Sequence, residues 1–479
     1  MITTASSVAI QGNEEAYALL KWKASFEKQS QSLLSSWNGS DPCSHWLGIA
    51  CDNSKSVSLL NFTNFGIRGT FLTLNFSSLP NIRAIVMRNN SFYGTIPKQI
   101  GSLSNLDTLN VHDNQLSGFI PKSIGSLSKL TLLDLAVNNF LGMVPPEMGK
   151  LANLSFLDVG VNKLFGNIPH EIWHLSNLKY LAFGTNDNLR GAIPAEIGML
   201  GKLTELRLEH CNFTGSIPTT IFNLTNLASL NLNDNNLDGP IPPEIGNLTN
   251  LAELYLNDNN LNGPIPREIG KFVNLKVLWL QGNELSGSFP REIGRMTNLY
   301  QLDFSANNLS GRIPSTIGNL SNLAYLYLFS NSLPGSIPDE IGKLHSLTTI
   351  QLLDNNLSGP ILPSIGNLVN LNSILLHENT LLGPIPSAIG KLVKLETLDL
   401  SQNSLSGPIP SSIGNLTELS ELVLLSNELN GEIPIEFGRK FQFQSAHLDL
   451  KAIEQIYGDW KKSYIESPRW ELGQAASPS

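Results

Sequence analysis

The sequence predicts an α/β solenoid, because one short apolar pattern recurs along most of its 479 residues. In the stretch 248–271, Leu254 and Leu256 flank Tyr255, as the two-residue period of a short strand requires. Asn259 follows as a turn, and a Gly and an Ile-Pro pair come after it at spacings that neither a helix nor an alternating strand produces. One such coil cannot bury its own apolar edge. We therefore expect the coils to stack, with one long parallel β-sheet on the concave face and short 3-10 or irregular segments on the convex face.

The asparagine of this pattern gives the register of the repeats. Its step is 24 residues almost everywhere, and it lengthens to 25 before Cys211, where Asn188 is interpreted as a one-residue insertion. A first coil with Phe65 at the register position brings the number of repeats to sixteen. A side-chain amide both donates and accepts, so we expect this residue to pair buried backbone groups of neighbouring coils. The register positions are Asn90, Asn114, Asn138, Asn162, Asn186, Cys211, Asn235, Asn259, Asn283, Asn307, Asn331, Asn355, Asn379, Asn403 and Asn427.

The amino-acid composition limits the classes of molecule that the chain is expected to bind. The formal net charge is −9 and the pI is about 5.4, which argues against nucleic acid and against an anionic membrane surface, because both need a basic footprint. No apolar run approaches the roughly 20 residues of a membrane span. The sequence predicts no cofactor.

Four segments are predicted. Residues 1–12 are expected to be disordered or the remnant of a secretory signal, and residues 13–56 form an N-terminal cap with one or two amphipathic helices, for which Tyr17, Trp22 and Leu33 supply part of the apolar face. Residues 57–438 hold the sixteen repeats. Residues 439–479 form an atypical tail, possibly helical, which either covers the end of the sheet or is unrelated sequence joined by truncation or rearrangement.

The three cysteines have two different interpretations. Cys43 and Cys51 are eight residues apart beside Trp46, which favours a disulfide bond that closes the cap; a pair of metal ligands is the alternative. A disulfide indicates an oxidising compartment. Cys211 stands at the register position, where we expect a buried structural role instead of a reactive thiol.

N-glycosylation signals also favour secretion, although a repeat rich in Asn, Leu, Ser and Thr creates Asn-x-Ser/Thr by chance. Asn212 and Asn308 directly follow register positions, so we expect poor access there. The sites that we expect on the outer side are Asn223, Asn247, Asn319 and Asn415.

The coil L-x-x-L-x-x-L-x-L-x-x-N-x-L-x-G-x-I-P-x-x-I-G-x resembles the plant-type extracellular leucine-rich repeat, and the cap with Trp37, Cys43, Trp46, Gly48 and Cys51 is similar to that of plant leucine-rich-repeat receptor-like kinases. The resemblance implies a right-handed superhelical ectodomain, on the extracellular side of the plasma membrane or secreted. It also implies a peptide or protein ligand and a leucine-rich-repeat co-receptor kinase. The chain has no Gly-rich phosphate loop, no H-R-D and no D-F-G, so the family's Ser/Thr kinase is absent and no enzyme activity is predicted. The paired-cysteine C-terminal cap of the family is absent too.

One catalytic motif is set aside. His170-Glu171-Ile172-Trp173-His174 matches H-E-x-x-H, in which two histidines bind zinc and the glutamate acts as base. Here Ile172 occupies an inward position of the repeat, and no third ligand stands at a useful spacing. We expect no zinc site.

Ligand contacts are expected on the concave face, where residues between and beside the inward leucines vary from coil to coil. Exposed aromatic residues with a polar rim are typical of protein interfaces, although strand propensity alone also favours aromatics. Arg207, with Glu209 and His210 beside it, adds a charged site. The predicted ligand-binding residues are Arg207, Tyr255, Trp279, Tyr300, Tyr325, Tyr327 and Phe329.

Three functional hypotheses follow. The first is the ligand-recognition domain of a plant receptor-like kinase, in which a peptide or protein bound on the concave face starts transmembrane signalling. The second is a secreted leucine-rich-repeat interaction protein that resembles inhibitors of cell-wall-degrading enzymes. The third is a truncated decoy that does not signal.

Overall fold

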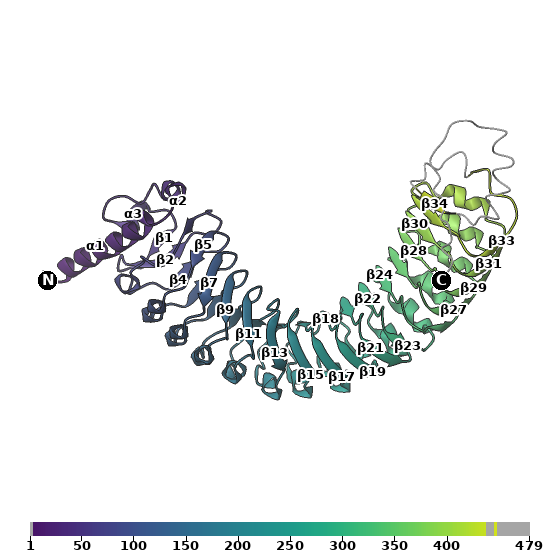
Figure 1. The fold of residues 1–479 in the computed structure, drawn as a ribbon, viewed down its shortest axis with the longest axis horizontal. Coiled ribbons are helices and arrows are strands. Elements are labelled where there is room, and N and C mark those ends of the chain that lie inside the picture. Colours follow the sequence, from purple (N-terminus) through teal and green to yellow (C-terminus); the bar gives the residue numbers. More distant parts are fainter. Residues whose placement is uncertain (1–2, 437–444, 448–479) are drawn as a thin grey trace, which may run out of the picture. The chain divides into compact units, whose positions relative to one another are not determined.

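The structure, a computed structural model, describes residues 3–436 and 445–447, with side chains described from residue 14 to residue 436 (Figure 1). The chain divides into two compact units, Met1–Asp238 and Gly239–Ser479. Each unit contains stacked coils, so the predicted α/β solenoid is confirmed within each of them.

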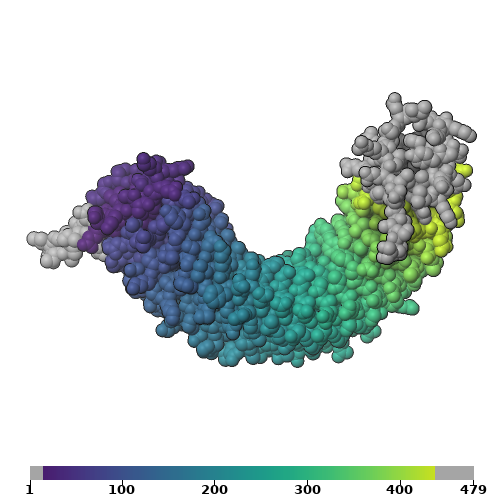
Figure 2. All heavy atoms as spheres, viewed as in Figure 1, coloured from purple at the N-terminus to yellow at the C-terminus, as the bar shows by residue number. Residues whose placement is uncertain are grey.

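The N-terminal cap contains three helices and a β-hairpin. The helices are α1 (Thr3–Ala24), α2 (Lys28–Leu33) and α3 (Pro42–His45), and β1 (Ile49–Cys51) pairs antiparallel with β2 (Val57–Asn61). Cys43 and Cys51 form a disulfide bond that joins α3 to β1. Figure 2 shows the cap, in purple, packed over the first coils of unit 1.

An aromatic cluster holds the cap on the coils. The Trp22 ring on α1 lies 4.9 Å from Phe26 and about 6 Å from Phe62, Phe71 and Phe92 of the first two coils. Trp22 Nε1 also donates to the Thr70 carbonyl at 2.7 Å. The cap therefore closes the apolar end that the first coil leaves open.

Buried carboxylate contacts complete this closure. Glu15 on α1 is fully buried and accepts hydrogen bonds from the Ser56 hydroxyl and the Val57 amide. Burial raises the pKa of Glu15, and the two hydrogen bonds oppose that rise.

Every predicted strand position carries a strand of the main sheet, and within each unit these strands pair in parallel at the predicted step. Most of them place one leucine or isoleucine inward between two partly exposed residues. In unit 1 the strands after β2 are β4 (Ala84–Val86), β6 (Thr108–Asn110), β8 (Leu132–Asp134), β10 (Phe156–Asp158), β12 (Tyr180–Ala182), β14 (Glu205–Arg207) and β16 (Ser229–Asn231). In unit 2 they are β18 (Glu253–Tyr255), β20 (Val277–Trp279), β22 (Gln301–Asp303), β24 (Tyr325–Tyr327), β26 (Thr349–Gln351), β28 (Ser373–Leu375), β30 (Thr397–Asp399), β32 (Glu421–Val423) and β34 (Ser445–His447).

A second set of parallel strands follows the turn of each coil. In unit 1 it contains β3 (Arg68–Gly69), β5 (Ser91–Gly94), β7 (Gln115–Phe119), β9 (Asn139–Gly142), β11 (Lys163–Gly166), β13 (Asn188–Ala192), β15 (Asn212–Ser216) and β17 (Asn236–Pro240), which ends just beyond the unit. In unit 2 it contains β19 (Asn260–Pro264), β21 (Glu284–Gly287), β23 (Asn308–Leu309), β25 (Pro334–Gly335), β27 (Asn356–Gly359), β29 (Thr380–Gly383), β31 (Ser404–Gly407) and β33 (Glu428–Leu429).

This second sheet breaks between β23 and β25 because of a proline. In the preceding coil the Ser310 amide donates to the Gly287 carbonyl at 2.9 Å. Pro334 occupies the equivalent position and has no N–H to donate to Gly311.

In fifteen coils the described residues on the remaining side include a 3-10 helix, as predicted. Nearly all of these helices follow a proline and bury an isoleucine. They are η1 (Phe76–Ser78), η2 (Lys98–Ser102), η3 (Lys122–Ser126), η4 (Pro146–Lys150), η5 (His170–His174), η6 (Ala195–Met199) and η7 (Thr219–Asn223) in unit 1, and η8 (Pro243–Asn247), η9 (Arg267–Lys271), η10 (Arg291–Arg295), η11 (Ser315–Asn319), η12 (Asp339–Lys343), η13 (Pro363–Asn367), η14 (Ser387–Lys391) and η15 (Ser411–Asn415) in unit 2.

The register asparagines form the predicted hydrogen-bond ladder. Asn307, for example, is 7% exposed; its Oδ1 accepts from the Leu285 amide of the preceding coil at 3.0 Å. Its Nδ2 donates to the Leu280 carbonyl of the preceding coil at 3.0 Å, and to two carbonyls of its own turn. One side chain therefore pairs four backbone groups that the short strands leave unpaired.

Cys211 replaces this asparagine where the repeat lengthens. The Leu189 amide, which an asparagine at position 211 would be expected to accept from, donates instead to the Asn186 carbonyl at 2.9 Å. The buried thiol contacts the carbonyl oxygens of Phe183 and Glu209 at 3.7 and 3.4 Å. Burial raises the pKa of Cys211 to about 12, in agreement with a structural role.

Three expectations about the ends need correction or lie outside the described residues. Helix α1 begins at Thr3, so the segment 1–12, expected to be disordered or the remnant of a signal, is helical from Thr3 onward, and the boundary at residue 13 falls inside the helix. Tyr17 and Leu33 are exposed, because the cap helices bury a narrower stripe around Trp22 and Phe26. β34 continues the repeat register beyond residue 438, and the helix expected in the tail lies outside the described residues.

We predict that Asn307→Ala lowers the free energy of unfolding by about 2–4 kcal/mol, because several backbone groups lose their partner in a site closed to water. Urea unfolding followed by circular dichroism measures the change. Cys211→Ala is the matched control and should cost no more than about 1 kcal/mol, because the thiol makes only weak hydrogen bonds. Equal losses in the two variants would contradict the ladder's role.

Candidate ligand-binding surface

The strand face is the surface formed by the outward side chains of the main-sheet strands and of the residues directly before and after them. Its positions are held by strands whose inward leucines are fully buried, such as Leu254 and Leu278. Because the backbone is fixed by the ladder, neighbouring coils place their outward residues in register, as Tyr255 and Trp279 show. Each unit has a different chemistry on this face.

In unit 2 the predicted aromatic residues form two groups. Tyr255 and Trp279 make an edge-to-face contact with ring centroids 5.0 Å apart. Tyr325 lies 5.4 Å from Tyr300 and 6.2 Å from Tyr327. Tyr300 is 49% exposed and the others are partly buried.

Phe329 joins neither group through a ring contact in the described structure. It lies two residues after Tyr327 and is partly exposed.

Tyr300 and Tyr325 also interact through their hydroxyl groups. A hydrogen bond with Tyr325 raises the pKa of Tyr300, with burial as the second cause. The aromatic patch of unit 2 is therefore Tyr255, Trp279, Tyr300, Tyr325 and Tyr327, with Phe329 at its edge.

A carboxylate separates the two aromatic groups. Asp303 pairs in register with Trp279 on one side and Tyr327 on the other. Its Oδ1 accepts from the Ser305 amide at 3.0 Å and from the Ser305 hydroxyl at 2.6 Å. Burial raises the pKa of Asp303, and these hydrogen bonds oppose the rise.

Polar atoms at the Tyr255–Trp279 end remain unpaired. Trp279 Nε1, Asn257 Oδ1 and Gln281 Oε1 are buried without a hydrogen-bond partner in the described structure. Asn257 is only 4% exposed and donates through Nδ2 to Asp258 at 2.7 Å. A buried donor and two buried acceptors without partners are costly, and this cost is typical of functional surfaces.

In unit 1 the predicted Arg207 is already bound to its own coil. Its guanidinium donates to Glu209 Oε1 at 2.9 and 3.1 Å and lies 4.0 Å from Glu205. Glu209 is 7% exposed and its Oε2 is unpaired. Arg207 is thus part of an acidic surface and uses two of its five N–H donors on Glu209, while His210 lies 3.3 Å from Asp234.

Two earlier coils of unit 1 carry aspartates in register with each other, Asp134 on β8 and Asp158 on β10. Asp158 accepts from the Gly160 amide at 2.9 Å and from the Tyr180 hydroxyl at 3.2 Å. Burial raises the pKa of Asp158 to about 6, and the charge of Asp134 adds to this rise. Burial likewise raises the pKa of Asp134, against the effect of His112 at 3.3 Å.

The H-E-x-x-H segment is the five-residue η5. Its two histidine rings lie 6.3 Å apart at nearly right angles, and His174 Nδ1 contacts the His170 carbonyl at 3.1 Å. Among the described residues there is no group of three side chains placed to hold a metal ion. The described helices also include none that is both long and apolar enough to cross a membrane.

The four predicted glycosylation residues are exposed at the last positions of 3-10 helices, namely Asn223, Asn247, Asn319 and Asn415. The poor access expected for Asn212 and Asn308 is wrong. Both are exposed, because they begin strands of the second sheet with their side chains outward.

Comparison with known proteins shows the family to which the chain belongs. The family described as Leucine-rich repeat region matches residues 169–281 and 257–377, and Leucine rich repeat N-terminal domain matches residues 12–52. The Leucine Rich Repeat family matches residues 105–127 and 394–416. The Arabidopsis thaliana protein MDIS1-interacting receptor like kinase 2 is 52% identical over 87 residues, which are 17% of this chain and 8% of that relative. The solved structure of the plant peptide hormone receptor RGFR1 in complex with RGF2 is 31% identical, with 85% of this chain and 83% of that chain covered and a TM-score of 0.53.

The chain belongs to the plant leucine-rich-repeat receptor-like kinase family. The ectodomain of the Arabidopsis receptor kinase HAESA, solved with a peptide hormone, is also similar to this chain, at 30% identity, coverage of 91% and 89%, and a TM-score of 0.54. The matched regions are leucine-rich repeats and their cap, and no kinase domain is evident in this receptor-like ectodomain. The aligned stretch spans less than a tenth of the curated receptor kinase.

Sequence reasoning missed the Asp134–Asp158–Tyr180 network as a unit. Both aspartates lie at the same position of adjacent coils, so the 24-residue step alone brings them into register. Tyr180 stands two positions earlier in its coil, and the direction of its side chain, which brings its hydroxyl to Asp158, is not evident from the sequence.

We predict that Asp158→Asn gains stability relative to the unchanged protein as the pH rises from 4 to 7. Below about pH 4 the Asp158 carboxyl is protonated in both the folded and the unfolded chain. Between pH 4 and about 6 it is protonated only in the folded chain, so the stability of the unchanged protein falls as the pH rises through this window. Asparagine does not titrate, and the relative gain should reach up to about 3 kcal/mol.

Urea unfolding at several pH values measures this gain. Asp399→Asn is the control, because Asp399 stands at the same position of its coil but has Leu375 and Val423 as its register neighbours. A gain that does not change with pH would contradict the interpretation.

Proposed function

We propose that this chain is the ligand-recognition part of a plant receptor-like kinase, and that it binds an extracellular peptide or protein on the strand face of unit 2. The aromatic patch is the observation that carries the proposal. Its rings stand on strands whose inward side is fully buried, so the patch is already ordered before a ligand arrives.

The chemistry of the patch suits a peptide. Tyrosine and tryptophan offer large apolar contact area at low entropic cost, and they dominate binding energy at protein interfaces. Asp303 between the two groups offers an acceptor or a negative charge, and the unpaired Trp279 Nε1 and Asn257 Oδ1 offer a donor and an acceptor. A ligand with apolar side chains around a polar backbone would use both kinds of contact.

The relatives support the same ligand class. RGFR1 and HAESA, whose ectodomains are similar to this one, were each solved with a peptide. The proposal therefore includes an extracellular location, a peptide or protein ligand, and a leucine-rich-repeat co-receptor that helps to start transmembrane signalling.

We predict that Trp279→Ala weakens binding of the cognate peptide by ten- to a hundredfold and leaves folding nearly intact, because the side chain lies on the outer face of the sheet. The ligand is first found by screening the purified chain against a library of secreted plant peptides. Isothermal titration calorimetry then compares the affinities of the variants.

Val423→Ala is the matched control, since Val423 occupies the same position of a later coil in unit 2 away from the aromatic rings. Its affinity should equal that of the unchanged chain. Unaltered affinity in Trp279→Ala would remove the patch from the ligand site, and equal losses in both variants would indicate a general change in the sheet.

A further inference from the structure

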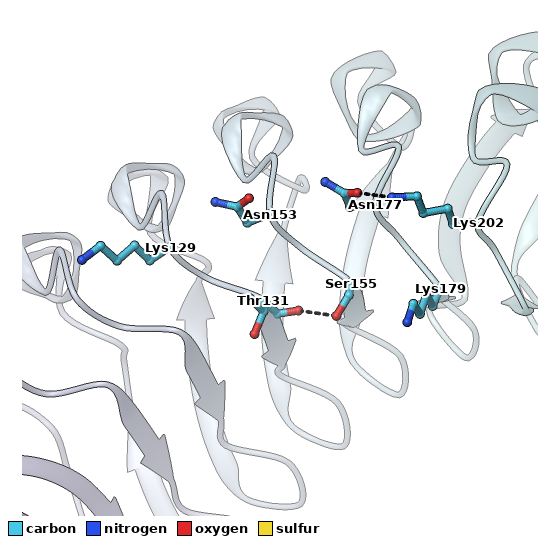
Figure 3. A pocket seen from close by; sticks show the side chains of 7 residues that line it. All are labelled: Lys129, Thr131, Asn153, Ser155, Asn177, Lys179 and Lys202. Atoms are coloured by element: carbon cyan, nitrogen blue, oxygen red, sulfur yellow. Dashed lines mark hydrogen bonds between the residues drawn. The ribbon is translucent and has the colours of Figure 1, made fainter.

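A shallow hollow of about 490 Å³ lies in unit 1, on the side of the coils where the chain enters β8, β10 and β12. Three of its lining residues, Thr131, Ser155 and Lys179, directly precede these strands. Figure 3 shows Lys129 and Lys202 at opposite ends of the row of side chains, with Asn153 and Asn177 between them. The other lining residues are Thr131, Ser155 and Lys179.

The neutral side chains of the hollow are committed to the fold. Asn153 Nδ2 donates to the Ser128 carbonyl and Asn177 Nδ2 to the Ala152 carbonyl, both at 2.8 Å. The hydroxyl of Ser155 donates to the carbonyl of Thr131, each at the start of its coil, at 3.1 Å. These groups form a fixed polar floor.

The three lysines have N–H donors that are not used in hydrogen bonds to described residues. Lys129 Nζ donates to Asn105 Oδ1 and Lys202 Nζ donates to Asn177 Oδ1, each at 2.7 Å. An ammonium group has three N–H donors, so each of these two lysines retains two. The Lys179 side chain has no hydrogen bond or ion pair to any described residue and keeps all three.

Charge in the hollow opposes that of the whole chain. Three ammonium groups line it without any carboxylate, although the chain carries a formal net charge of −9. Unpaired like charges on a shared polar floor attract an anion with several negative groups. The lining residues are all polar or charged, and the apolar surface among them comes from short segments such as lysine stems.

We propose that this hollow binds an acidic oligosaccharide, a chain of uronic acid or sulfated sugar residues. The lysines pair with its carboxylates or sulfates, and its hydroxyl groups meet the polar floor of Thr131, Ser155 and the two asparagines. The volume lies within the range of small-ligand sites in proteins. This inference does not rest on peptide recognition, which uses unit 2.

The lysines could serve only to hold neighbouring coils together, and a matched variant distinguishes this structural role from ligand binding. Lys394 in unit 2 donates to Asn370 Oδ1 at 2.8 Å, the same bond that Lys129 and Lys202 make to their asparagines. Lys394 thus reproduces the structural contact at a position that does not belong to the hollow.

Titration calorimetry of the purified chain with a ten-residue oligogalacturonate tests the proposal; a sulfated oligosaccharide of equal length tells the two acidic groups apart. We expect binding that weakens with added salt, and at least a tenfold loss of affinity in Lys179→Gln combined with Lys202→Gln. Lys179→Gln alone should fold normally and show part of the loss, because Lys179 holds no structural contact. Lys394→Gln should bind as the unchanged chain does.

Several results would overturn the proposal: no binding of either acidic oligosaccharide, equal binding of neutral maltodecaose, tighter binding of a ten-residue poly-glutamate peptide, or the same loss in Lys394→Gln. Asn153 begins an Asn-x-Ser pattern, so peptide mapping of the chain from a plant host accompanies the assay. A glycan attached at Asn153 would cover the hollow and would also overturn it. A loss of peptide binding in Trp279→Ala leaves this outcome unaffected.

Discussion

The hydrogen bonds of the buried asparagine ladder are the interaction on which this structure depends. After β2, each main-sheet strand is only three residues long, so the chain leaves the sheet while its backbone is still in the core. Asn307 and its equivalents supply the donor and acceptor that strand pairing no longer provides. Without them, each coil would bury several unpaired groups at about 1–3 kcal/mol apiece. A second row works at the opposite edge of the coils, where Asn177 donates to Ala152 and Asn298 to Val273.

The ladder also imposes a backbone conformation that ordinary residues avoid. The residue before each register position has a positive φ, and it is a glycine only at Gly282. Val137 and Val161 adopt φ values of +53° and +49°, although a β-branched side chain disfavours this region by roughly 1–2 kcal/mol. The coil tolerates this because the next residue, Asn138 or Asn162, makes several hydrogen bonds that fix the turn. Strain at one position is therefore offset by pairing at its neighbour.

Periodicity explains why the fold could be predicted and the details of the surface could not. Leu254, Asn259 and Ile269 each have one physical task that recurs in every coil, so a single sequence reveals them. Cys211 can replace the asparagine because the Leu189 amide already donates to the Asn186 carbonyl. The pattern of side chains in the sequence does not predict this backbone hydrogen bond. The aromatic cluster of Tyr255 and Trp279 was predictable because both residues occupy one register position. The hydrogen bonds between Arg207 and Glu209 within one coil could not be predicted, because they depend on the directions of the two side chains.

The same periodicity brings equivalent residues of adjacent coils side by side on the strand face. Parallel strands lie about 4.8 Å apart, so whatever stands at one position of a coil is pressed against its equivalents in the adjacent coils. Where two aspartates meet, as at Asp134 and Asp158, the repulsion and the burial together raise the pKa of Asp158 to about 6. Where two aromatics meet, as at Tyr255 and Trp279, they form one broad apolar surface. A substitution on the strand face therefore changes contacts with the residues at the same position of both neighbouring coils.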